Sequence, residues 1–356
     1  MRYKSCDWIE NGISFDVDSY KVCCLYSAIG GGNTIVKTEY TGEPINWDEF
    51  FWIKQKIREQ HQKGIINAKC KGCVNLVEKE WCSPQNSISF INLDYWTKCN
   101  SRCSFCFTMK DKDYYNSFKN YDFLPILEDM IQKGIISTSG HVSFGGGEVT
   151  LLVEFETILN KFIDLGFKHI KIHSSCINYS TAIERGLEKG VIELIVSVDA
   201  GSKDLHKKIK QVDSYDNVWK NLSEYVSHQH ENSVVKTKYI LIPGVNDSKK
   251  EIDLWLDKSC QIGISSVIQE IESEWFYKRR DTVPATIIEY FEYTKNKSAS
   301  MGMNFELYER ASHMMSFYID KHKNILFWFL KKKFNKIFSI LKKIKSKIFS
   351  FFSSLC

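Results

Sequence analysis

Three cysteines lie close together in the run CNSRCSFC, with the spacing C-x3-C-x2-C: Cys99, Cys103 and Cys106. Thiolates at this spacing can each hold one iron of a [4Fe–4S] cluster, which leaves the fourth iron without a protein ligand. A cluster with four protein ligands mainly moves electrons, whereas an open iron can bind and activate a substrate. The spacing therefore indicates a catalytic cluster.

The array resembles the C-x3-C-x-aromatic-C signature of the radical S-adenosylmethionine (SAM) enzymes, with Phe105 at the aromatic position. The resemblance implies that the open iron chelates the amino and carboxylate groups of SAM. It also implies that an electron from the reduced cluster splits the sulfonium, and that the resulting 5'-deoxyadenosyl radical removes a hydrogen atom from a substrate. In such an enzyme the cofactors carry the chemistry, and the protein positions and shields them.

A zinc knuckle and a disulfide pair are the alternative interpretations of the three cysteines. Structural zinc sites usually have four protein ligands in two short pairs, which a triplet fits poorly. Disulfides are rare in a chain that stays in a reducing compartment. The cluster is therefore the favoured reading.

A second motif, HVSFGGGEVT, follows a predicted strand at residues 141–144. It resembles the family's Gly-Gly-Glu-Pro motif, with Val149 in place of the proline. The resemblance implies that this segment holds the SAM amino group, with Glu148 as the acceptor. Glycine lets the backbone approach a ligand closely. The expected SAM-binding residues here are Gly145, Gly146, Gly147 and Glu148.

The strand that begins at Ile192 resembles a family strand ending in Ser-x-Asp. By this resemblance Ser197 and Asp199 would face the ribose or methionine carboxylate of SAM. An ordinary strand end followed by a helix cap is the alternative. Relatives often have Thr-Asn-Gly where this chain has Ser174 and Ser175, and the missing Asn-Gly leaves a ligand role for these serines without support.

Strand-like and helix-like segments alternate between residues 87 and 308, which indicates an α/β fold with a parallel sheet. The expected strands are 88–93, 141–144, 169–173, 192–198, 235–242 and 266–271. The expected helices are 124–133, 151–165, 181–189, 218–228 and 249–262. Six such units resemble the open, partial (β/α)6 TIM-type barrel of radical SAM enzymes. In that fold the chemistry lies at the carboxyl ends of the strands, where all three motifs fall.

Polar residues near the ends of the last two expected strands also have predicted roles. Asn246 or Asp247 is expected to cap the helix that follows the fifth strand. No general base is assigned: Glu270 and Glu272, near the end of the last expected strand, are the candidates, and a place on the polar rim is the favoured alternative.

Residues 1–86 are expected to form a small cysteine-rich domain before the barrel at 87–308. The region resembles the auxiliary-cluster (SPASM or twitch) domains of many radical SAM enzymes, although those usually follow the barrel. The resemblance implies a second cluster held by Cys6, Cys24, Cys70 and Cys73, with Cys23 or Cys82 as substitutes. A four-cysteine structural zinc site is the alternative. Residues 47–62 are expected to form a helix that faces the core.

Residues 309–356 are expected to form a helical tail, whose last part, 321–356, holds ten lysines and no acidic residue. Removing these ten from the 48 Lys and Arg leaves 38 against 43 Asp and Glu, so the body is mildly acidic and no nucleic-acid partner is expected. Apolar residues recur every three or four positions with lysines opposite, which is typical of a helix lying on an anionic membrane. Packing on the barrel, a coiled coil and a nucleic-acid-binding tail are the alternatives.

The N-terminus has no apolar segment of the secretion type, so we expect a cytoplasmic protein, peripheral on the inner face of the membrane through its tail. The chemistry requires a reductant such as a ferredoxin or flavodoxin. The expected activity is SAM cleavage and hydrogen abstraction from an unknown substrate, with surface polysaccharide or glycan chemistry ranked ahead of maturation of a ribosomally made peptide or partner protein. A non-catalytic, membrane-docked iron–sulfur or zinc protein is the alternative of another class.

Overall fold

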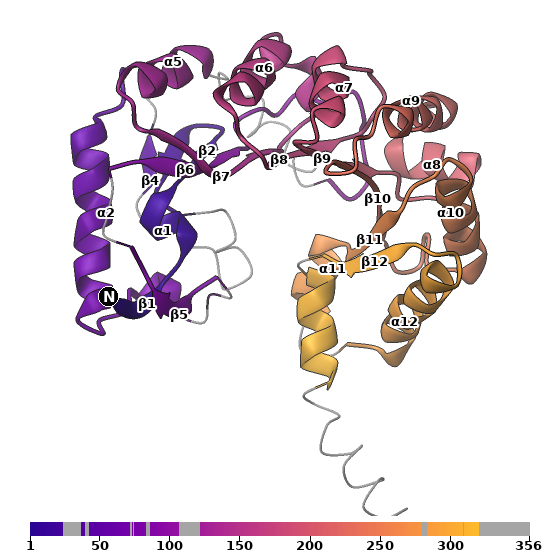
Figure 1. Ribbon diagram of the computed structural model, residues 1–356. Helices are drawn as coiled ribbons and strands as arrows, with labels where there is room; N and C mark the ends of the chain where they lie inside the picture. The colour runs from indigo at the N-terminus through magenta and orange to yellow at the C-terminus, as the bar shows by residue number, and fades with distance from the viewer. Residues whose placement is uncertain are drawn as a thin grey trace, which may run out of the picture.

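A computed structural model describes residues 1–23, 37–39, 43–71, 73, 75–82, 86–106, 122–279, 283–308 and 310–319. Its main feature is one sheet of ten strands in the order β12-β11-β10-β9-β8-β7-β6-β2-β3-β4. The sheet curves into a horseshoe with helices on its outer, convex side, and its two edges do not meet (Figure 1). The fold is therefore α/β with an open, partial barrel, as the sequence predicts.

The strands have the following bounds. In the main sheet they are β2 (Gly12–Asp16), β3 (Ser19–Lys21), β4 (Lys37–Glu39), β6 (Ile88–Leu93), β7 (Ile136–Phe144), β8 (Ile170–Ser174), β9 (Ile192–Ser197), β10 (Val234–Leu241), β11 (Ser266–Ile271) and β12 (Asn304–Leu307). Outside it, β1 (Arg2–Ser5) pairs antiparallel with β5 (Val77–Glu80).

The α-helices are α1 (Asp7–Asn11), α2 (Trp47–Gln62), α5 (Leu124–Gln132), α6 (Phe155–Leu165), α7 (Thr181–Glu188), α8 (Lys203–Lys210), α9 (Tyr215–Ser227), α10 (Lys249–Gln261), α11 (Ser273–Arg279) and α12 (Ala285–Ser300). Short 3-10 turns occupy η2 (Ala68–Cys70) and η3 (Val149–Leu151). Residues 310–319 are also helical.

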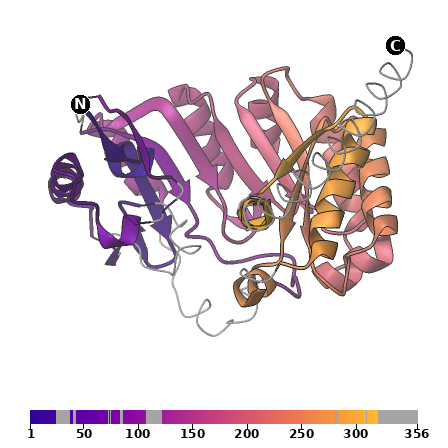
Figure 2. The same ribbon diagram turned by 90° about the horizontal axis from the view of Figure 1, so that it is seen from below.

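The six predicted strands are β6 to β11, and each pairs in parallel with the next. The sheet also contains two parallel strands that the sequence analysis does not predict. Strand β2 pairs with β6, and β12 pairs with β11. Helix α8 was also missed, because its sequence KDLHKKIK is dominated by lysine and reads as a solvated segment. Figure 2 shows the strands lining the inside of the curve and the helices outside it.

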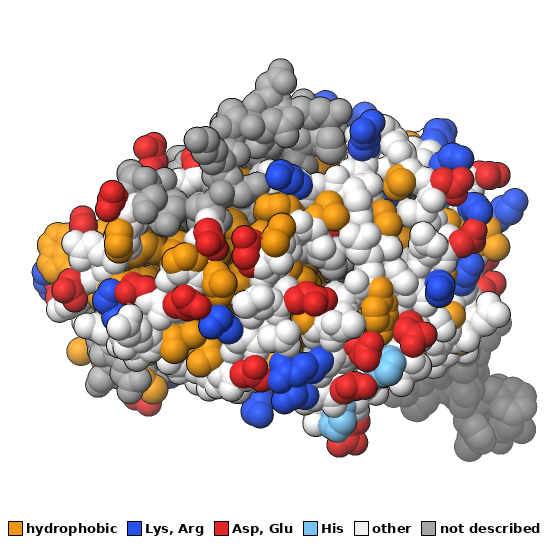
Figure 3. All heavy atoms as spheres, turned by 90° about the horizontal axis from the view of Figure 1, so that it is seen from above, with side chains coloured by type: hydrophobic (Ala, Val, Ile, Leu, Met, Phe, Trp, Pro, Cys, Tyr) orange, Lys and Arg blue, Asp and Glu red, His pale blue; other side chains and the backbone are white. Residues whose placement is uncertain are grey.

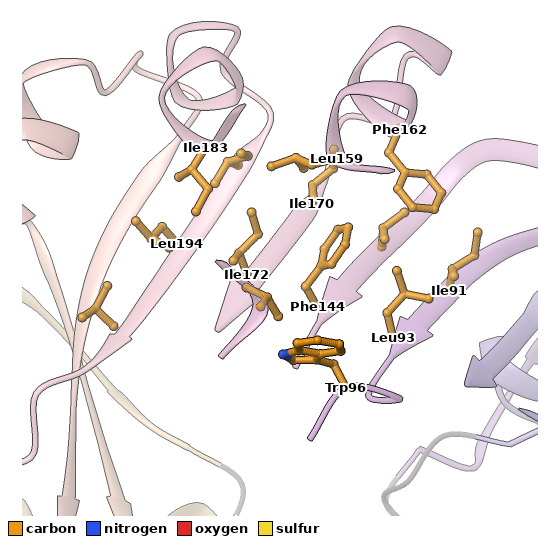
Figure 4. Packing of buried hydrophobic residues seen from close by; sticks show 14 of the residues in the cluster. Ile91, Leu93, Trp96, Phe144, Leu159, Phe162, Ile170, Ile172, Ile183 and Leu194 are labelled. Carbon is orange, nitrogen blue, oxygen red and sulfur yellow. The ribbon is translucent and has the colours of Figure 1, made fainter. Parts of the chain in front are cut away.

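The core fills the space between the sheet and the outer helices. Alternate residues of each strand point outward, so Phe144 of β7 and Ile172 of β8 pack against Leu159 and Phe162 of α6 (Figure 4). Helix α6 buries its apolar residues at i, i+3, i+4 and i+7 spacing, which is the pattern of a helix with one buried face. The intervening strand residues face the inside of the barrel, where they are available for chemistry.

The N-terminal residues continue the barrel sheet, because β2 pairs in parallel with β6 from Gly12–Phe90 to Phe15–Leu93. Helix α2 has the predicted bounds and faces the core through Phe50 and Ile57. It is tied down by Lys54, whose buried ammonium donates to the backbone oxygens of Trp8 and Gly12, both at 2.7 Å. The division into parts at residues 1–86, 87–308 and 309–356 remains a prediction.

Acidic and basic side chains are interspersed over the outer helical face, and histidine lies beside acidic groups near one edge (Figure 3). Within the described part of the chain, no helix combines the length and the apolar character needed to cross a bilayer. The basic stretch 321–356 lies outside the described residues.

Candidate active site

The cysteine loop follows β6 at the carboxyl end of the barrel, as expected. Its backbone lies against the last turn of α8, where the amides of Arg102 and Ser104 donate to the carbonyl oxygens of Lys210 and Ile209 at 2.9 and 3.0 Å. Helix carbonyls at a C-terminus lack partners inside the helix, so these bonds complete α8 and fix the loop together. The unpredicted helix therefore positions the predicted cysteines.

A buried ion pair lies beneath this loop. Lys210 Nζ is 2.5 Å from Asp199 Oδ2, and both side chains are almost inaccessible to solvent. Burial by itself lowers the pKa of Lys210, but the nearby Asp199 and Cys103 outweigh it and hold the pKa above its usual value. The ammonium is also 5.8 Å from the ring centre of Phe105. Lys210 thus places a fixed positive charge next to the cysteine loop, and the sequence analysis did not single it out.

The other oxygen of Asp199 accepts from the amide of Ile240 at 2.8 Å, and Asp199 has a left-handed backbone with φ of 60°. Among the described residues, the carboxylate is therefore paired with Lys210 and with β10. Ser197, two residues earlier, faces the inside of the barrel and has no hydrogen-bond partner in the described part of the chain. Their contact with SAM stays a prediction.

The glycine motif packs directly on the segment that leads into the cysteine loop. A Cβ on Gly146 would lie 2.4 Å from the Trp96 carbonyl oxygen, and one on Gly147 would lie 2.3 Å from the Lys98 carbonyl oxygen. The amides of Gly147 and Glu148 donate to those same oxygens at 2.6 and 2.9 Å. Only glycine permits so close an approach of two backbones, so the motif joins the ends of β6 and β7.

Glu148 connects three strand ends through its buried carboxylate. Oε1 accepts from the hydroxyls of Thr150 and Ser174 at 2.7 and 2.8 Å, and Oε2 accepts from the Ser175 amide at 2.5 Å. The Ser175 hydroxyl in turn donates to Asn100 Oδ1 at 3.1 Å inside the cysteine loop. Ser174 and Ser175, which the sequence left without a role, therefore orient Glu148. Oε2 retains acceptor capacity for a ligand amine.

The loop fits an iron–sulfur cluster by its donor set. None of the described cysteines forms a disulfide. Asn100 Nδ2 and Ser101 Oγ, between the first two cysteines, are buried and have no partner among the described residues, so both donors are available to inorganic sulfide. Burial raises the pKa of the Cys99 thiol, and that of Cys103 to about 11. Iron binding would therefore displace protons from both thiols.

A single-ion arrangement is found elsewhere in the described residues. One group of three ligand atoms lies within 4.8 Å of one another, and it consists of Glu184, Glu188 and His228 on the outer surface. The three loop cysteines do not form such a group with one another or with other described residues.

Three expectations about polar residues are corrected. The cap of α10 is Ser248, which accepts from the Glu251 amide, rather than Asn246 or Asp247. Asn246 instead bridges the backbones of Asp199, Ile240 and Ile242. Glu270 and Glu272 are buried rather than on the rim. Backbone amides satisfy their carboxylates: Glu270 accepts from the Ala311 amide at 2.9 Å, and Glu272 accepts from the Trp275 amide at 2.7 Å.

The N-terminal cysteines lie on several elements of the first 86 residues. Cys6 is buried and caps α1 by accepting from the Ile9 amide, while Cys70 is buried at the end of η2. Cys73 donates its amide to the Cys70 carbonyl oxygen at 3.0 Å. Both Cys6 and Cys23 act on the pKa of Lys54, which burial lowers to about 7. Cys82 is exposed, and Cys24 lies outside the described residues.

Comparisons with known proteins find partial similarity to proteins in other organisms. A probable GTP 3',8-cyclase from Sulfurisphaera tokodaii is 29% identical over 129 residues, which span 36% of this chain and 40% of that protein. The structure of Streptococcus suis SuiB bound to S-adenosylmethionine aligns with 78% of this chain and 60% of its own, with a TM-score of 0.52 and 17% identity. This chain thus spans less than two thirds of either protein.

Residues 94–256 match the family model described as the Radical SAM superfamily. The match begins at the end of β6 and contains the cysteine loop, the glycine motif, Glu148 and the Asp199–Lys210 pair. Members of this superfamily are enzymes that cleave SAM at a [4Fe–4S] cluster. Residues 94–256 therefore form a Radical SAM domain.

Proposed function

We propose that this protein binds a [4Fe–4S] cluster through Cys99, Cys103 and Cys106 and abstracts a hydrogen atom from a substrate held inside the barrel. The cluster would supply the electron that splits SAM into methionine and a 5'-deoxyadenosyl radical. The observation that carries the proposal is the joining of the cysteine loop to the glycine motif, through backbone bonds at 2.6 and 2.9 Å and through the Asn100–Ser175–Glu148 contacts.

The protein's own residues bind, orient and shield in this proposal. The cysteine loop is held in place by α8, and Lys210 places a positive charge beside the thiolates. Glu148, aligned by Ser174 and Ser175, would accept from the amino group of SAM, while Gly145 to Gly147 keep its backbone close to the loop. Ser197 and Asp199 would lie on the ribose or carboxylate side. Such fixed donors and acceptors select which substrate hydrogen is nearest.

The experiment is anaerobic reconstitution with iron and sulfide, followed by dithionite and SAM. Formation of 5'-deoxyadenosine, measured by liquid chromatography and mass spectrometry, supports the enzyme. Its absence from protein with a fully loaded cluster contradicts the proposal and favours a non-catalytic iron–sulfur protein.

We further propose that Cys6, Cys24, Cys70 and Cys73, with Cys23 or Cys82 as substitutes, hold an auxiliary cluster. The burial of Cys6 and Cys70 and the short Cys70–Cys73 connection support this proposal. Iron and sulfide counts of about eight per chain are expected for two clusters, whereas about four with one zinc would assign the N-terminal cysteines to zinc.

For the substrate, we propose a component of surface polysaccharide or glycan metabolism. Support comes from the basic, amphipathic stretch 321–356, which would bring the enzyme to an anionic membrane and to lipid-linked substrates. Feeding candidate sugar substrates to the reconstituted enzyme and following deuterium transfer into 5'-deoxyadenosine tests this assignment. Transfer from a peptide and from no sugar would contradict it.

A further inference from the structure

The inside of the barrel carries charged side chains on β8, β9, β10 and β12. One group is fully paired: Lys171 lies 3.2 Å from Glu193, and Lys236 lies 2.9 Å from Glu193 and 2.6 Å from Glu306. Each cation in this group has a carboxylate within ion-pair distance. The two lysines and two glutamates therefore neutralise one another, and this group has no net charge with which to bind a ligand.

Lys238 lies one step closer to the carboxyl ends of the strands. It is two residues after Lys236 on β10, so it faces the same inner side, and it sits opposite Ser197 of β9 in the parallel register. No carboxylate lies within 4.0 Å of its ammonium in the described part of the chain. Nζ lies 5.5 Å from the ring centre of Tyr308 instead. Among the described residues, Lys238 is thus a half-buried cation without a counter-ion.

The nearby acidic groups are already neutralised. Asp199 is held by Lys210 at 2.5 Å, and Glu270 faces Arg310 at 3.6 Å while accepting from the Ala311 amide. Burial lowers the pKa of Lys238; Asp199 and Glu270 oppose this, whereas Arg310 and Lys210 add to it. These four groups and Lys238 together carry three positive and two negative charges. The region therefore has an excess of positive charge that an anion would compensate.

Hydrogen-bond donors lie next to Lys238. Tyr308 follows β12 and places its hydroxyl 3.4 Å from His173 Nε2 of β8, across the inside of the horseshoe. Burial and the neighbouring Lys238 and Lys171 hold the pKa of His173 well below its usual value, so the imidazole is neutral. The hydrogen bond between them uses the proton of one group, so the pair carries at most one further proton for an acceptor. An ammonium, a phenol and an imidazole therefore meet on one wall.

We propose that Lys238, with His173 and Tyr308 beside it, forms a subsite that binds a carboxylate or phosphate group of the substrate inside the barrel. This proposal rests on the proposed function, because the bound anion is part of a substrate only if the protein is the enzyme proposed above. Charge-assisted hydrogen bonds are the strongest that such a site can make. Because Lys238 lies opposite Ser197, the bound anionic group would fix the substrate next to the expected SAM site, and neutral substrates would be held less well.

The test uses the full-length, anaerobically reconstituted protein and titrates inorganic phosphate and acetate by calorimetry. Lys238→Met is expected to weaken binding of the preferred anion by about ten-fold or more, as for loss of a charge-assisted hydrogen bond. Lys238→Arg is expected to retain most of the affinity. Lys208→Met, which removes an exposed lysine of α8, is the matched control and is expected to bind as the wild type does. SAM affinity is expected to be unchanged in all variants.

Comparing the two anions shows whether the substrate carries a phosphate or a carboxylate group. Tighter binding of phosphate assigns a phosphorylated substrate, and tighter binding of acetate assigns a carboxylate. Lys238→Gln gives a second reading should Lys238→Met fail to fold. The subsite is overturned if the wild type binds neither anion, if Lys238→Met and Lys238→Gln bind the anion like the wild type, or if these two variants lose SAM binding rather than anion binding.

Measuring 5'-deoxyadenosine in the same samples separates this proposal from the proposed function. Wild-type protein that cleaves SAM but binds no anion keeps the enzyme and rejects the subsite. Wild-type protein that binds the anion through Lys238 but forms no 5'-deoxyadenosine keeps the subsite and rejects the enzyme.

Discussion

Burial of the cysteine loop governs how its thiols take up metal. Cys103 has the pKa raised to about 11 by burial, while Lys210 acts in the opposite direction and favours the thiolate. Metal binding must then remove a proton that the apo-protein holds tightly, so cluster assembly is expected to be faster at higher pH.

Cys103→Ala is expected to remove about four iron atoms per chain and to abolish 5'-deoxyadenosine formation, because a cubane needs all three protein thiolates. Iron analysis and product chromatography measure the two effects. Cys260→Ala, at an exposed cysteine of α10, is the control. Equal losses in both variants would contradict the assignment of the loop.

The Lys210–Asp199 pair is expected to behave as a coupled unit. Lys210→Met leaves a buried carboxylate without its cation and is expected to lower the free energy of unfolding by about 3–5 kcal/mol. The double variant Lys210→Met, Asp199→Asn removes both charges and is expected to lose much less. Urea titration measures each value. Additive losses would show that the two side chains do not interact.

At the scale of elements, the glycine motif and the cysteine loop are held together by close contact between their backbones. Gly147→Ala places a Cβ 2.3 Å from the Lys98 carbonyl oxygen, and we expect it to separate the glycine motif from the cysteine loop. The expected cost is about 1–3 kcal/mol in unfolding free energy, together with weaker SAM binding. Equilibrium binding of SAM is the measurement.

Gly134→Ala is the control for that prediction. Gly134 has a positive φ of 62° but open space around it, so alanine there adds backbone strain without a clash. We expect it to cost stability and to leave SAM affinity unchanged. The same loss of SAM affinity in both variants would exclude the contact as the cause.

The attachment of α6 to the sheet depends on Phe162, which is fully buried against Phe144 and Phe167. Phe162→Ala is expected to cost about 3–5 kcal/mol in unfolding free energy, through lost burial and the cavity left behind. Val153→Ala, at a side chain that is 91% exposed, is expected to change stability by less than about 0.5 kcal/mol. Urea titration compares the two, and similar losses would contradict the packing.

At the scale of the whole molecule, one sheet runs from the N-terminal strands to β12. The first 86 residues therefore share a sheet with the barrel through β2 and β6. Metal in the N-terminal region would be expected to stabilise one edge of the barrel as well as its own segment.

Removal of residues 321–356 is expected to abolish binding to anionic vesicles, because each lysine near such a surface contributes about 1 kcal/mol. SAM cleavage should be preserved, since the cysteine loop and the glycine motif lie far away in sequence. Vesicle sedimentation and product analysis measure the two properties. Undiminished vesicle binding by the shortened protein would refute the membrane role of the tail.

The sequence by itself determined the features that are local. The cysteine triplet occupies eight consecutive residues, and the alternation of strands and helices repeats along the chain, so both are visible without a fold. The order of the barrel strands β6 to β11 and the position of the motifs at their carboxyl ends follow from that alternation. Expected and observed strand bounds agree closely, except that β7 begins at Ile136 rather than at residue 141.

Only the tertiary structure decided which side chains meet. Ser174 and Glu148 are 26 residues apart, and Tyr308 and His173 are 135 apart, so their contacts depend on which strands lie near one another. Lys210 and Lys238 read as ordinary lysines in the sequence. The fold buries Lys210 against Asp199, and it places Lys238 where no described residue provides a counter-ion. Side-chain chemistry of this kind depends on neighbours that only folding brings together.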